Sequence, residues 1–449
     1  MRSNSFSYIL LIVLGILSLI LYGMAPQSYS YNYCLYLFLI FCVDVYIVYK
    51  ERCKYTLVNF ETFFTIAFAF VNYVYPMVFY QIDPYFSLFA LDFPEDYINK
   101  GTAVATVAYT FLSLGLCKSN VLPRFIFGGN CDIGRNRSFT SYTNFLLIAM
   151  IIALIPMMNS GTYNDWGSAS NIRLILDVFL FYTLFQKLFL YRNIPFREIL
   201  NKNRLFFILV IAYALSASLI GNRGIVIRIG SIVVLLYSVL YKEIKKIYLV
   251  CFLIFGMVFM FLFGAVRDSG SIERAVENSA SVFSVGRDLT INNRSLYVLV
   301  DYADKHGVTY GQNFLSHLLS PIPFAQSTLL TITGWKVRDI SSGSLVTDDY
   351  FNNTATNIDS YGLGTNLVGD VYLAFGIVGV VILFYLLGLA ISKIYRKAQQ
   401  GSALSLLTYS ILFITAIIWT REAYFKPLQL VLWCLALYYL IEKKSVRRI

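Results

Sequence analysis

The sequence carries little charge. Only 14% of its 449 residues are Asp, Glu, Lys or Arg, against about 25% in a typical soluble domain. Hydrophobic residues make up 58% of the chain, and the mean hydropathy is +0.65. These values exclude a soluble globular protein and indicate an integral membrane protein, in which each span needs about 20 apolar residues.

Histidine, cysteine and the common catalytic motifs are also scarce. The chain has two histidines, and none of its seven cysteines lies between residues 267 and 366. No Cys/His spacing typical of a zinc site is present, so we expect no metal and no cofactor. An Asp-x-Asp motif, a P-loop, a Gly-x-Ser-x-Gly motif and a His-Glu-x-x-His motif are all missing. This disfavours nucleotide-sugar donors, ATP hydrolysis and zinc-dependent hydrolysis.

What the chain has in abundance is apolar runs of membrane-spanning length. We expect an all-α, polytopic membrane protein of about twelve transmembrane helices, because a span in lipid must satisfy its own backbone hydrogen bonds. The first run is too long for a signal-peptide core and is interpreted as retained. The predicted spans cover residues 6–24, 31–49, 58–80, 101–117, 142–158, 171–190, 205–221, 224–241, 247–265, 367–391, 402–419 and 427–441.

Lysine and arginine are distributed unevenly between the connectors. Most of the 36 basic residues lie at the N-terminus, at the C-terminus and in every second connector, whereas residues 81–99 are acidic. The positive-inside rule therefore predicts that both termini are cytoplasmic. The net charge of +11 is mainly a topology signal. No basic soluble face for nucleic acid is present.

One long polar segment interrupts the spans, at residues 267–366; we call it the insert. It divides the chain into residues 1–266 with spans one to nine, the insert, and residues 367–449 with spans ten to twelve. The topology puts the insert on the external, periplasmic side. Apolar spacing predicts short helices over 271–283, 289–300 and 310–319, with residues 334–361 as a loop. We expect these helices to lie across the outer mouth of the membrane domain as a lid.

Arginines gather in and near the insert. Guanidinium groups bind phosphate oxygens through bidentate, permanently charged contacts, and intramembrane charges are usually functional. Arg223 lies in a tight glycine-flanked turn between spans seven and eight, with Arg228 about one and a half turns further on. The alternatives are snorkelling for Arg223, a structural ion pair for Arg228 and a solvated, salt-bridged surface for the others. The candidate anion-binding residues are Arg223, Arg228, Arg267, Arg287, Arg294 and Arg421.

Two residues are candidates for proton transfer. His317 lies on the predicted helix that ends before Pro321 and Pro323, and histidine is the usual proton-transfer group near neutral pH. Asp370 opens span ten, where a carboxylate is also favoured by the helix dipole alone. His306 precedes a glycine and is interpreted as a helix C-terminal residue.

Together these features resemble the Wzy-type oligosaccharide repeat-unit polymerases, also called O-antigen polymerases. The resemblance covers the layout of the whole chain. At residue level it depends on Gly221-Asn-Arg-Gly224, the Arg267 region, His317 before the two prolines, and Gly362-Leu-Gly-Thr followed by Gly376-Ile-Val-Gly379.

The resemblance implies a membrane glycosyltransferase of the GT-C type B architecture in the bacterial inner membrane. It would need no metal and would act outside that membrane on undecaprenyl-pyrophosphate-linked glycans. It would move the growing chain onto the non-reducing end of a new lipid-linked repeat unit. A polysaccharide chain-length regulator is a further possible partner.

Two other functions stay open at this point. An O-antigen ligase, which transfers the finished glycan to lipid A core, has nearly the same layout. A lipid-linked oligosaccharide flippase or other secondary transporter belongs to a different class. It would not need so long an external insert, and it would have charged residues in the middle of its spans.

Overall fold

The structure is a computed structural model. It describes residues 5–82, 95–119, 121–122, 125–126, 137–160, 169–219, 224–252, 254, 256, 282–348 and 364–446. Within these ranges every regular element is a helix and no strand occurs. The predicted all-α class is therefore confirmed.

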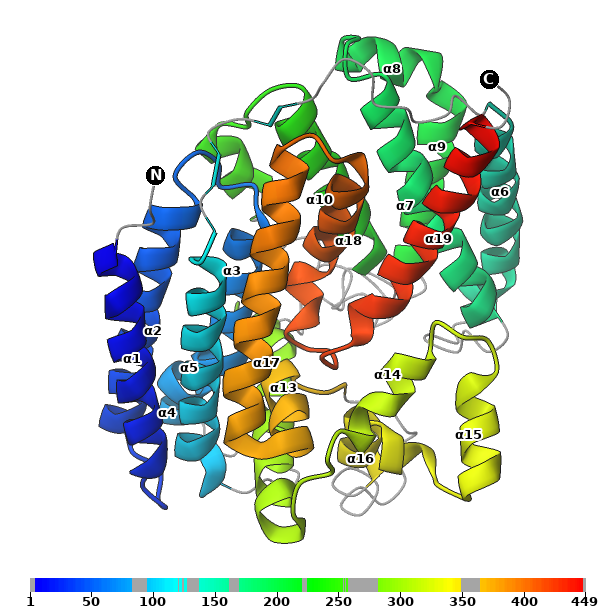
Figure 1. The fold of residues 1–449 in the computed structure, drawn as a ribbon. Helices are drawn as coiled ribbons and strands as arrows, with labels where there is room; N and C mark the ends of the chain where they lie inside the picture. The colour runs from blue at the N-terminus through cyan, green and yellow to red at the C-terminus, as the bar shows by residue number, and fades with distance from the viewer. Residues whose placement is uncertain are drawn as a thin grey trace.

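The N-terminal helices form one side of the bundle (Figure 1). They are α1 (Ser5–Gly23), α2 (Tyr31–Arg52), α3 (Phe60–Asn72), η1 (Tyr75–Phe79), α4 (Tyr80–Ile82) and α5 (Tyr97–Leu116). The hydroxyl of Ser30 caps α2 and the amide oxygen of Asn59 caps α3, as expected of residues whose side chains accept from unpaired N–H groups. Both α1 and α2 pack against α5.

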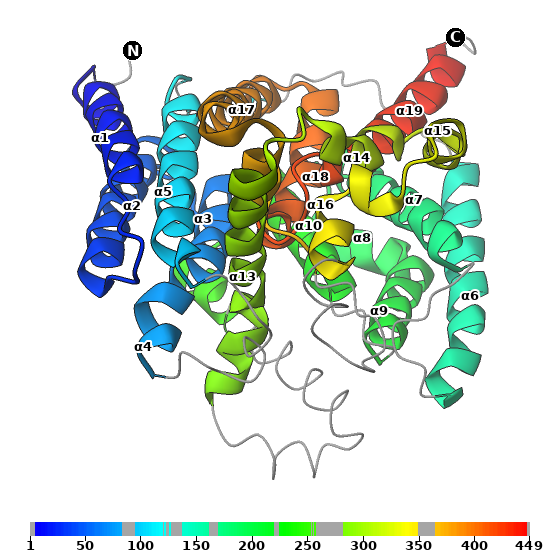
Figure 2. The ribbon, with the colours of Figure 1, turned by 90° about the horizontal axis from the view of Figure 1, so that it is seen from below.

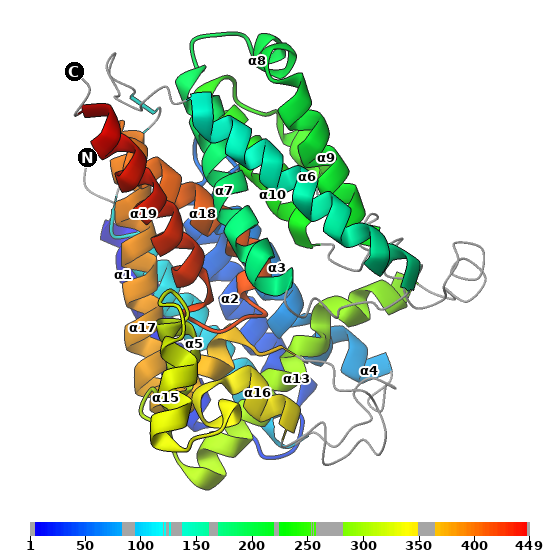
Figure 3. The same cartoon turned by 90° about the vertical axis from the view of Figure 1, so that its right-hand side faces the viewer.

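The middle of the chain forms the opposite side of the bundle (Figures 1 and 3). Its helices are α6 (Arg137–Ser160), α7 (Ala169–Leu190), α8 (Phe196–Lys202), α9 (Arg204–Leu219) and α10 (Gly224–Leu240). Helix α6 packs against α7 and α9, and α10 packs against α7.

The C-terminal helices α17 (Leu367–Gln399), α18 (Ala403–Trp419) and α19 (Lys426–Val446) join the two sides. Helix α17 crosses α5 at two glycines, Gly115 and Gly388. A Cβ on Gly115 would lie 2.2 Å from the carbonyl oxygen of Tyr385, and one on Gly388 would lie 2.3 Å from that of Leu112. Small residues at such a crossing allow the close backbone approach that stabilises helix pairs in membranes.

Helix α17 is interrupted near its start. Phe375 and Gly376 have non-helical backbone angles, and Gly376 has a φ of 62°, which glycine adopts without a Cβ penalty. The segment of α17 that precedes this break carries Asp370 and is wholly buried.

The insert is built differently from the predicted lid. Its first described helix, α13 (Val282–His306), contains the predicted helix over 289–300 but is longer, and it packs inside the bundle against α3, α5 and α17 (Figure 2). The predicted helix over 310–319 is found as η2 (Gln312–Phe314) and α14 (Leu315–Leu319). Most of the predicted helix over 271–283 lies outside the described residues.

The insert also contains helices that were not predicted. Helix α15 (Ala325–Thr333) was not expected, because only the helix-breaking effect of the prolines before it was considered. The predicted loop over 334–361 contains η3 (Val337–Ile340) and α16 (Ser342–Val346). These two elements are only four or five residues long, so their apolar positions are too few to give a periodic pattern.

Each predicted span except the ninth coincides with a helix or a bent helix pair, and helical residues 246–252 begin the ninth. By length and composition, three helices in the described ranges can cross a bilayer, α1, α2 and α17. The number rises to five if α3 with η1–α4 and α8 with α9 each form one bent span. The apolar helices support an integral membrane protein, and the count of twelve spans stays a prediction.

The bundle has two distinct ends (Figure 1). The start of α1, the end of α19 and helix α8 lie at one end, which we call the terminal end. Helices α14, α15 and α16 lie at the other, which we call the insert end.

Candidate active site

A cavity of about 540 Å³ opens at the insert end. Its walls come from α14, from η3 and α16, from the residues just before α17, and from the connector between α18 and α19. The lining residues are His317, Val337, Ser341, Gly343, Ser344, Thr347, Asp348, Gly364, Thr365, Glu422 and Ala423. The cavity therefore lies at the seam between the insert and the membrane-spanning helices.

The start of α17 is fixed beside this cavity by Asn366. Its backbone is extended, and its side-chain oxygen accepts from the N–H groups of Val368 at 2.9 Å and Gly369 at 3.3 Å. An asparagine at this position satisfies N–H groups that have no partner within the helix. The first turn of α17 thus begins at a defined point next to Thr365, which lines the cavity.

Asn366 also starts a chain of buried hydrogen bonds between four elements. Its Nδ2 donates to Asn72 Oδ1 of α3 at 3.0 Å and to the carbonyl oxygen of Asn292 of α13 at 3.3 Å. Asn292 Nδ2 donates to the carbonyl oxygen of Thr365 at 3.1 Å. Arg421 Nε, from the α18–α19 connector, donates to Asn292 Oδ1 at 2.6 Å. We call Asn72, Asn292, Asn366 and Arg421 the Asn366 network.

Asp370 lies one turn into α17 and is completely buried. Its Oδ1 accepts from Asn313 Nδ2 at 2.7 Å, and its Oδ2 accepts from the backbone N–H of Tyr424 at 2.9 Å. Asp370 does not line the cavity. The carboxylate therefore holds η2 and the α18–α19 connector against α17, which fixes two of the cavity walls.

His317 is half-buried on α14 and faces the cavity. Burial, together with the positive charge of Lys426, lowers the pKa of His317 to about 3 from an ordinary value of 6.5. The imidazole is therefore neutral at physiological pH, and at so low a pKa it is a weak base. Two carboxylates, Asp348 and Glu422, line the same cavity.

The three predicted arginines whose side chains the structure describes, Arg228, Arg294 and Arg421, do not gather at one place. Arg421 joins the Asn366 network and is adjacent in sequence to Glu422, which lines the cavity. Arg294 is buried in α13, where desolvation lowers its pKa to about 10, so it stays charged. Arg228 Nη1 lies 4.0 Å from Asp177 Oδ2 of α7. This geometry agrees with the ion-pair alternative for Arg228.

Three predicted arginines cannot be placed. Arg223 and Arg267 lie outside the described residues, and the side chain of Arg287 is not described. Their anion-binding roles therefore stay predictions. On the side of the C-terminal helices, the described part of the seam is formed by the residues just before α17 and by the connector between α18 and α19.

Sequence reasoning missed the amides Asn72, Asn292, Asn313 and Asn366. Uncharged amides, among them Asn292 and Asn293 of α13, were not treated as candidates. Both residues are buried. Their signal in the sequence was the pair of adjacent amides before Arg294 in an otherwise amphipathic helix.

Among the described residues, no three His, Cys, Asp or Glu side chains are grouped closely enough to hold a metal ion. The described cavity instead offers a neutral imidazole, carboxylates, hydroxyls and one neighbouring guanidinium. Such a set can orient a sugar hydroxyl, accept its proton and stabilise negative charge.

Comparison with known proteins gave one match. A family model described as O-antigen polysaccharide polymerase Wzy matches residues 4–443, which is almost the whole chain. No match was found among curated proteins or among solved structures.

Proposed function

The chain belongs to the O-antigen polysaccharide polymerase Wzy family, and we propose that it joins lipid-linked oligosaccharide repeat units at the insert end of the bundle. The growing glycan would move from undecaprenyl pyrophosphate onto the non-reducing end of a new lipid-linked unit. The observation that carries this proposal is the cavity between the insert and α17–α19, which combines His317 with carboxylates and is lined by Glu422, the residue that follows Arg421.

The reaction is a single group transfer. A hydroxyl oxygen of the acceptor sugar attacks the anomeric carbon of the donor sugar. The bond from that carbon to the phosphate oxygen breaks, and undecaprenyl pyrophosphate leaves with the electron pair. The proton of the acceptor hydroxyl passes to a base, so atoms and charges balance without a metal or a cofactor.

We assign the base to His317, with the carboxylate of Glu422, which lines the same cavity, as the alternative. A base is most effective when its pKa is near the working pH, and the pKa of His317 is far lower. A bound pyrophosphate would bring negative charge close to the imidazole and raise that pKa. Substrate binding would thus activate the base.

We assign stabilisation of the leaving pyrophosphate to Arg421, with Arg223, Arg267 and Arg287 as further candidates. Guanidinium groups meet phosphate charge without a metal. Asp370 is reassigned from catalysis to positioning, because both of its oxygens are used to hold η2 and the α18–α19 connector. Arg228 and Arg294 receive structural roles.

We further propose that the terminal end is cytoplasmic and the insert end external. Helix α8, with its basic residues Arg197 and Lys202, lies at the terminal end (Figure 1), in line with the positive-inside rule. A cysteine introduced at the exposed Lys336 in a cysteine-free chain should react with a membrane-impermeant maleimide in spheroplasts. Labelling only after lysis would reverse the orientation.

The function is tested in a strain that lacks this gene. We expect surface glycan with single repeat units, and a restored ladder of longer chains when the wild-type chain is supplied. An unchanged ladder in the deletion strain would refute the proposal. Polymer on the lipid carrier without transfer to lipid A core would indicate a ligase instead.

The two histidines provide a matched pair of variants in the same strain. His317→Ala should shorten the ladder while the protein still reaches the membrane. His306→Ala is the control, because His306 is exposed at the end of α13 and stacks on Tyr302 away from the lining residues of the cavity. Equal ladders from both variants would remove His317 from the mechanism.

A further inference from the structure

A second cavity, of about 430 Å³, lies beside the first and differs from it in chemistry. Its walls are α7, α19 and the segment that follows α14, and its lining residues are apolar. Leu432 and Leu440 of α19 are 42% and 65% exposed, so this groove is open along one side. We call it the α7–α19 groove.

The groove and the polar cavity share one wall. His317 on α14 lines the polar cavity, and Pro321, four residues later, lines the groove. Helix α19 fixes this wall, because Trp433 Nε1 donates to the carbonyl oxygen of Pro321 at 2.9 Å and Gln429 Nε2 donates to that of Ser320 at 2.7 Å. An amphipathic molecule can therefore place its polar half in the polar cavity and its apolar half in the groove, on the two sides of the Ser320–Pro321 segment.

The α7–α19 groove runs in the direction that an extended lipid chain would take, away from the polar cavity and along α19. Its lining on α19 extends from Leu432 to Leu440, which is about 12 Å at 1.5 Å per residue. Helix α19 runs from the insert end to the terminal end (Figures 1 and 3). The groove thus begins beside the polar cavity and continues along the bundle toward the bilayer interior.

From this arrangement we propose that the α7–α19 groove binds the polyprenyl chain of a lipid-linked substrate. This rests on the proposed function. The glycan would occupy the polar cavity, and the pyrophosphate would lie at the mouth, near Lys426 and Arg421. Because the surrounding lipid is as apolar as the groove, contacts with Phe179, Trp433 and Leu437 would favour the chain through close van der Waals packing and not through removal of apolar surface from water. The apolar lining excludes a glycan from the groove itself.

The test compares two carriers with the same glycan pyrophosphate, one with a long polyprenyl chain and one with a two-isoprene chain. Ala436 is exposed in the groove, so Ala436→Trp fills the groove without disturbing the core. We expect this variant to lower kcat/KM at least tenfold for the long-chain substrate and less than threefold for the short-chain one. The control is Ile382→Trp, at a 51% exposed position on α17, which should change neither value.

Equal losses for both carriers, or no loss for either, would overturn the groove assignment. If the wild-type protein polymerises neither substrate, the proposed function fails, and the groove is then tested by binding. A benzophenone-bearing polyprenyl pyrophosphate should label α19, and unlabelled long-chain polyprenyl pyrophosphate should compete. Competition by an equal amount of phosphatidylglycerol would mean that the groove holds a bulk lipid chain, which also contradicts the proposal.

Discussion

Helix α17 carries a buried polar network at each end, and the two are built from different groups. At the terminal end, Arg52 donates from Nε and Nη2 to Glu61 Oε1 at 2.8 and 2.7 Å, and from Nη1 to Ser392 Oγ of α17 at 3.2 Å. We call these three residues the Arg52–Glu61 network. At the insert end, the Asn366 network joins three amides to one arginine.

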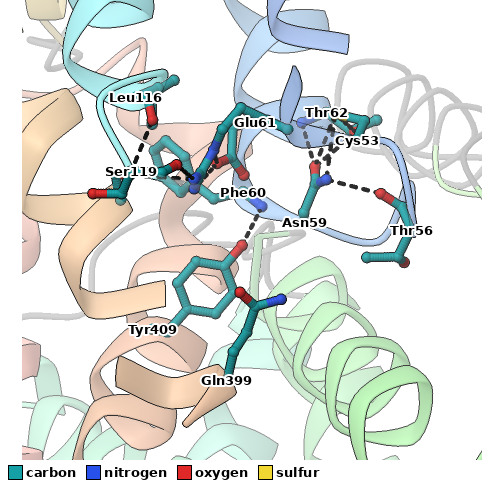
Figure 4. A network of polar contacts seen from close by, with 12 residues as sticks. Cys53, Thr56, Asn59, Phe60, Glu61, Thr62, Leu116, Ser119, Gln399 and Tyr409 are labelled. Atoms are coloured by element: carbon teal, nitrogen blue, oxygen red, sulfur yellow. Dashed lines mark hydrogen bonds and ion pairs between the residues drawn. The ribbon is translucent and has the colours of Figure 1, made fainter. Parts of the chain in front are cut away.

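The surroundings of the two networks differ as well. The Arg52–Glu61 network is an ion pair whose side chains are about 1% exposed, and Figure 4 shows Glu61 among neighbouring loops and helices, with the hydroxyl of Tyr409 bonded to the N–H of Phe60. None of its members lines the polar cavity. The Asn366 network is next to that cavity, since Thr365 both accepts from Asn292 and lines it.

From this difference we infer that the Arg52–Glu61 network stabilises the fold and that the Asn366 network serves the activity. In a buried pair of opposite charges each group neutralises the other, so no net charge remains for a ligand, and removal of one partner leaves a costly unpaired charge. A network of neutral amides around one guanidinium keeps positive charge beside a cavity where an anion can bind. We therefore expect damage to the first network to remove the folded protein, and damage to the second to remove activity.

The largest effect is expected from the Arg52–Glu61 pair. Arg52→Ala leaves the Glu61 carboxylate buried without its ion-pair partner, which should lower the free energy of unfolding by about 3–5 kcal/mol. Thermal unfolding of the purified protein and its abundance in the membrane provide the measurement. The double variant Arg52→Ala with Glu61→Ala should be less unstable than Arg52→Ala alone, because no uncompensated charge remains.

An exposed pair provides the control for that experiment. Lys202 and Glu198 on α8 are separated by 3.6 Å, and their side chains are 58% and 56% exposed. Glu198→Ala should change stability by only about 0–1 kcal/mol. If Arg52→Ala is no more harmful than this control, the buried pair does not stabilise the fold and the comparison fails.

A smaller effect, on activity instead of abundance, is expected from Arg421. Arg421→Ala removes the charged contact that we propose for the leaving pyrophosphate, of the kind that contributes about 1.5–3 kcal/mol, so polymerisation should fall by about 10- to 100-fold while most of the protein stays folded. Arg421→Lys keeps the charge but loses the planar donor geometry and should recover only part of the rate.

Arg396→Ala is the matched control, since Arg396 is exposed at the other end of α17. Its polymer ladder should equal that of the wild type. The amount of Arg421→Ala protein in the membrane is measured alongside. If it falls as much as the polymer does, Arg421 stabilises the fold and the two networks do not differ in function.

The smallest effect is expected from the pH dependence of stability at His317. The unfolded imidazole titrates near its ordinary value of 6.5 and the folded one near 3, so the unfolded chain binds more protons between these values. The free energy of unfolding should therefore fall as the pH falls from 6.5 toward 3. At pH 5 the loss from this one group is about 1–2 kcal/mol.

His317→Gln should remove that part of the pH dependence, and His306→Ala should leave it in place. Unfolding measured at pH 5 and at pH 7.5 for both variants isolates the contribution of His317. A wild-type slope in His317→Gln would show that His317 is not held neutral by burial.

Much of the architecture was predictable from the sequence because apolar periodicity is a local property. Helices such as α2, α7 and α18 begin and end close to the predicted limits. The helix over 310–319 and its end before Pro321 were also correct, since proline cannot continue a helix. The Arg52–Glu61 pair was not predicted, because the two residues come from different helices and meet only through the fold.

The sequence by itself determined that this is a helical membrane protein with one polar insert, and it pointed to His317 as a residue of the site. Those conclusions need only composition, run length and residue chemistry. Only the tertiary structure decided that α13 is a core helix, that both carboxylate oxygens of Asp370 accept hydrogen bonds, and that Arg228 faces Asp177. These facts depend on which surfaces of distant segments meet. In the Asn366 network the asparagines form at least as many of the hydrogen bonds beside the cavity as the arginine does.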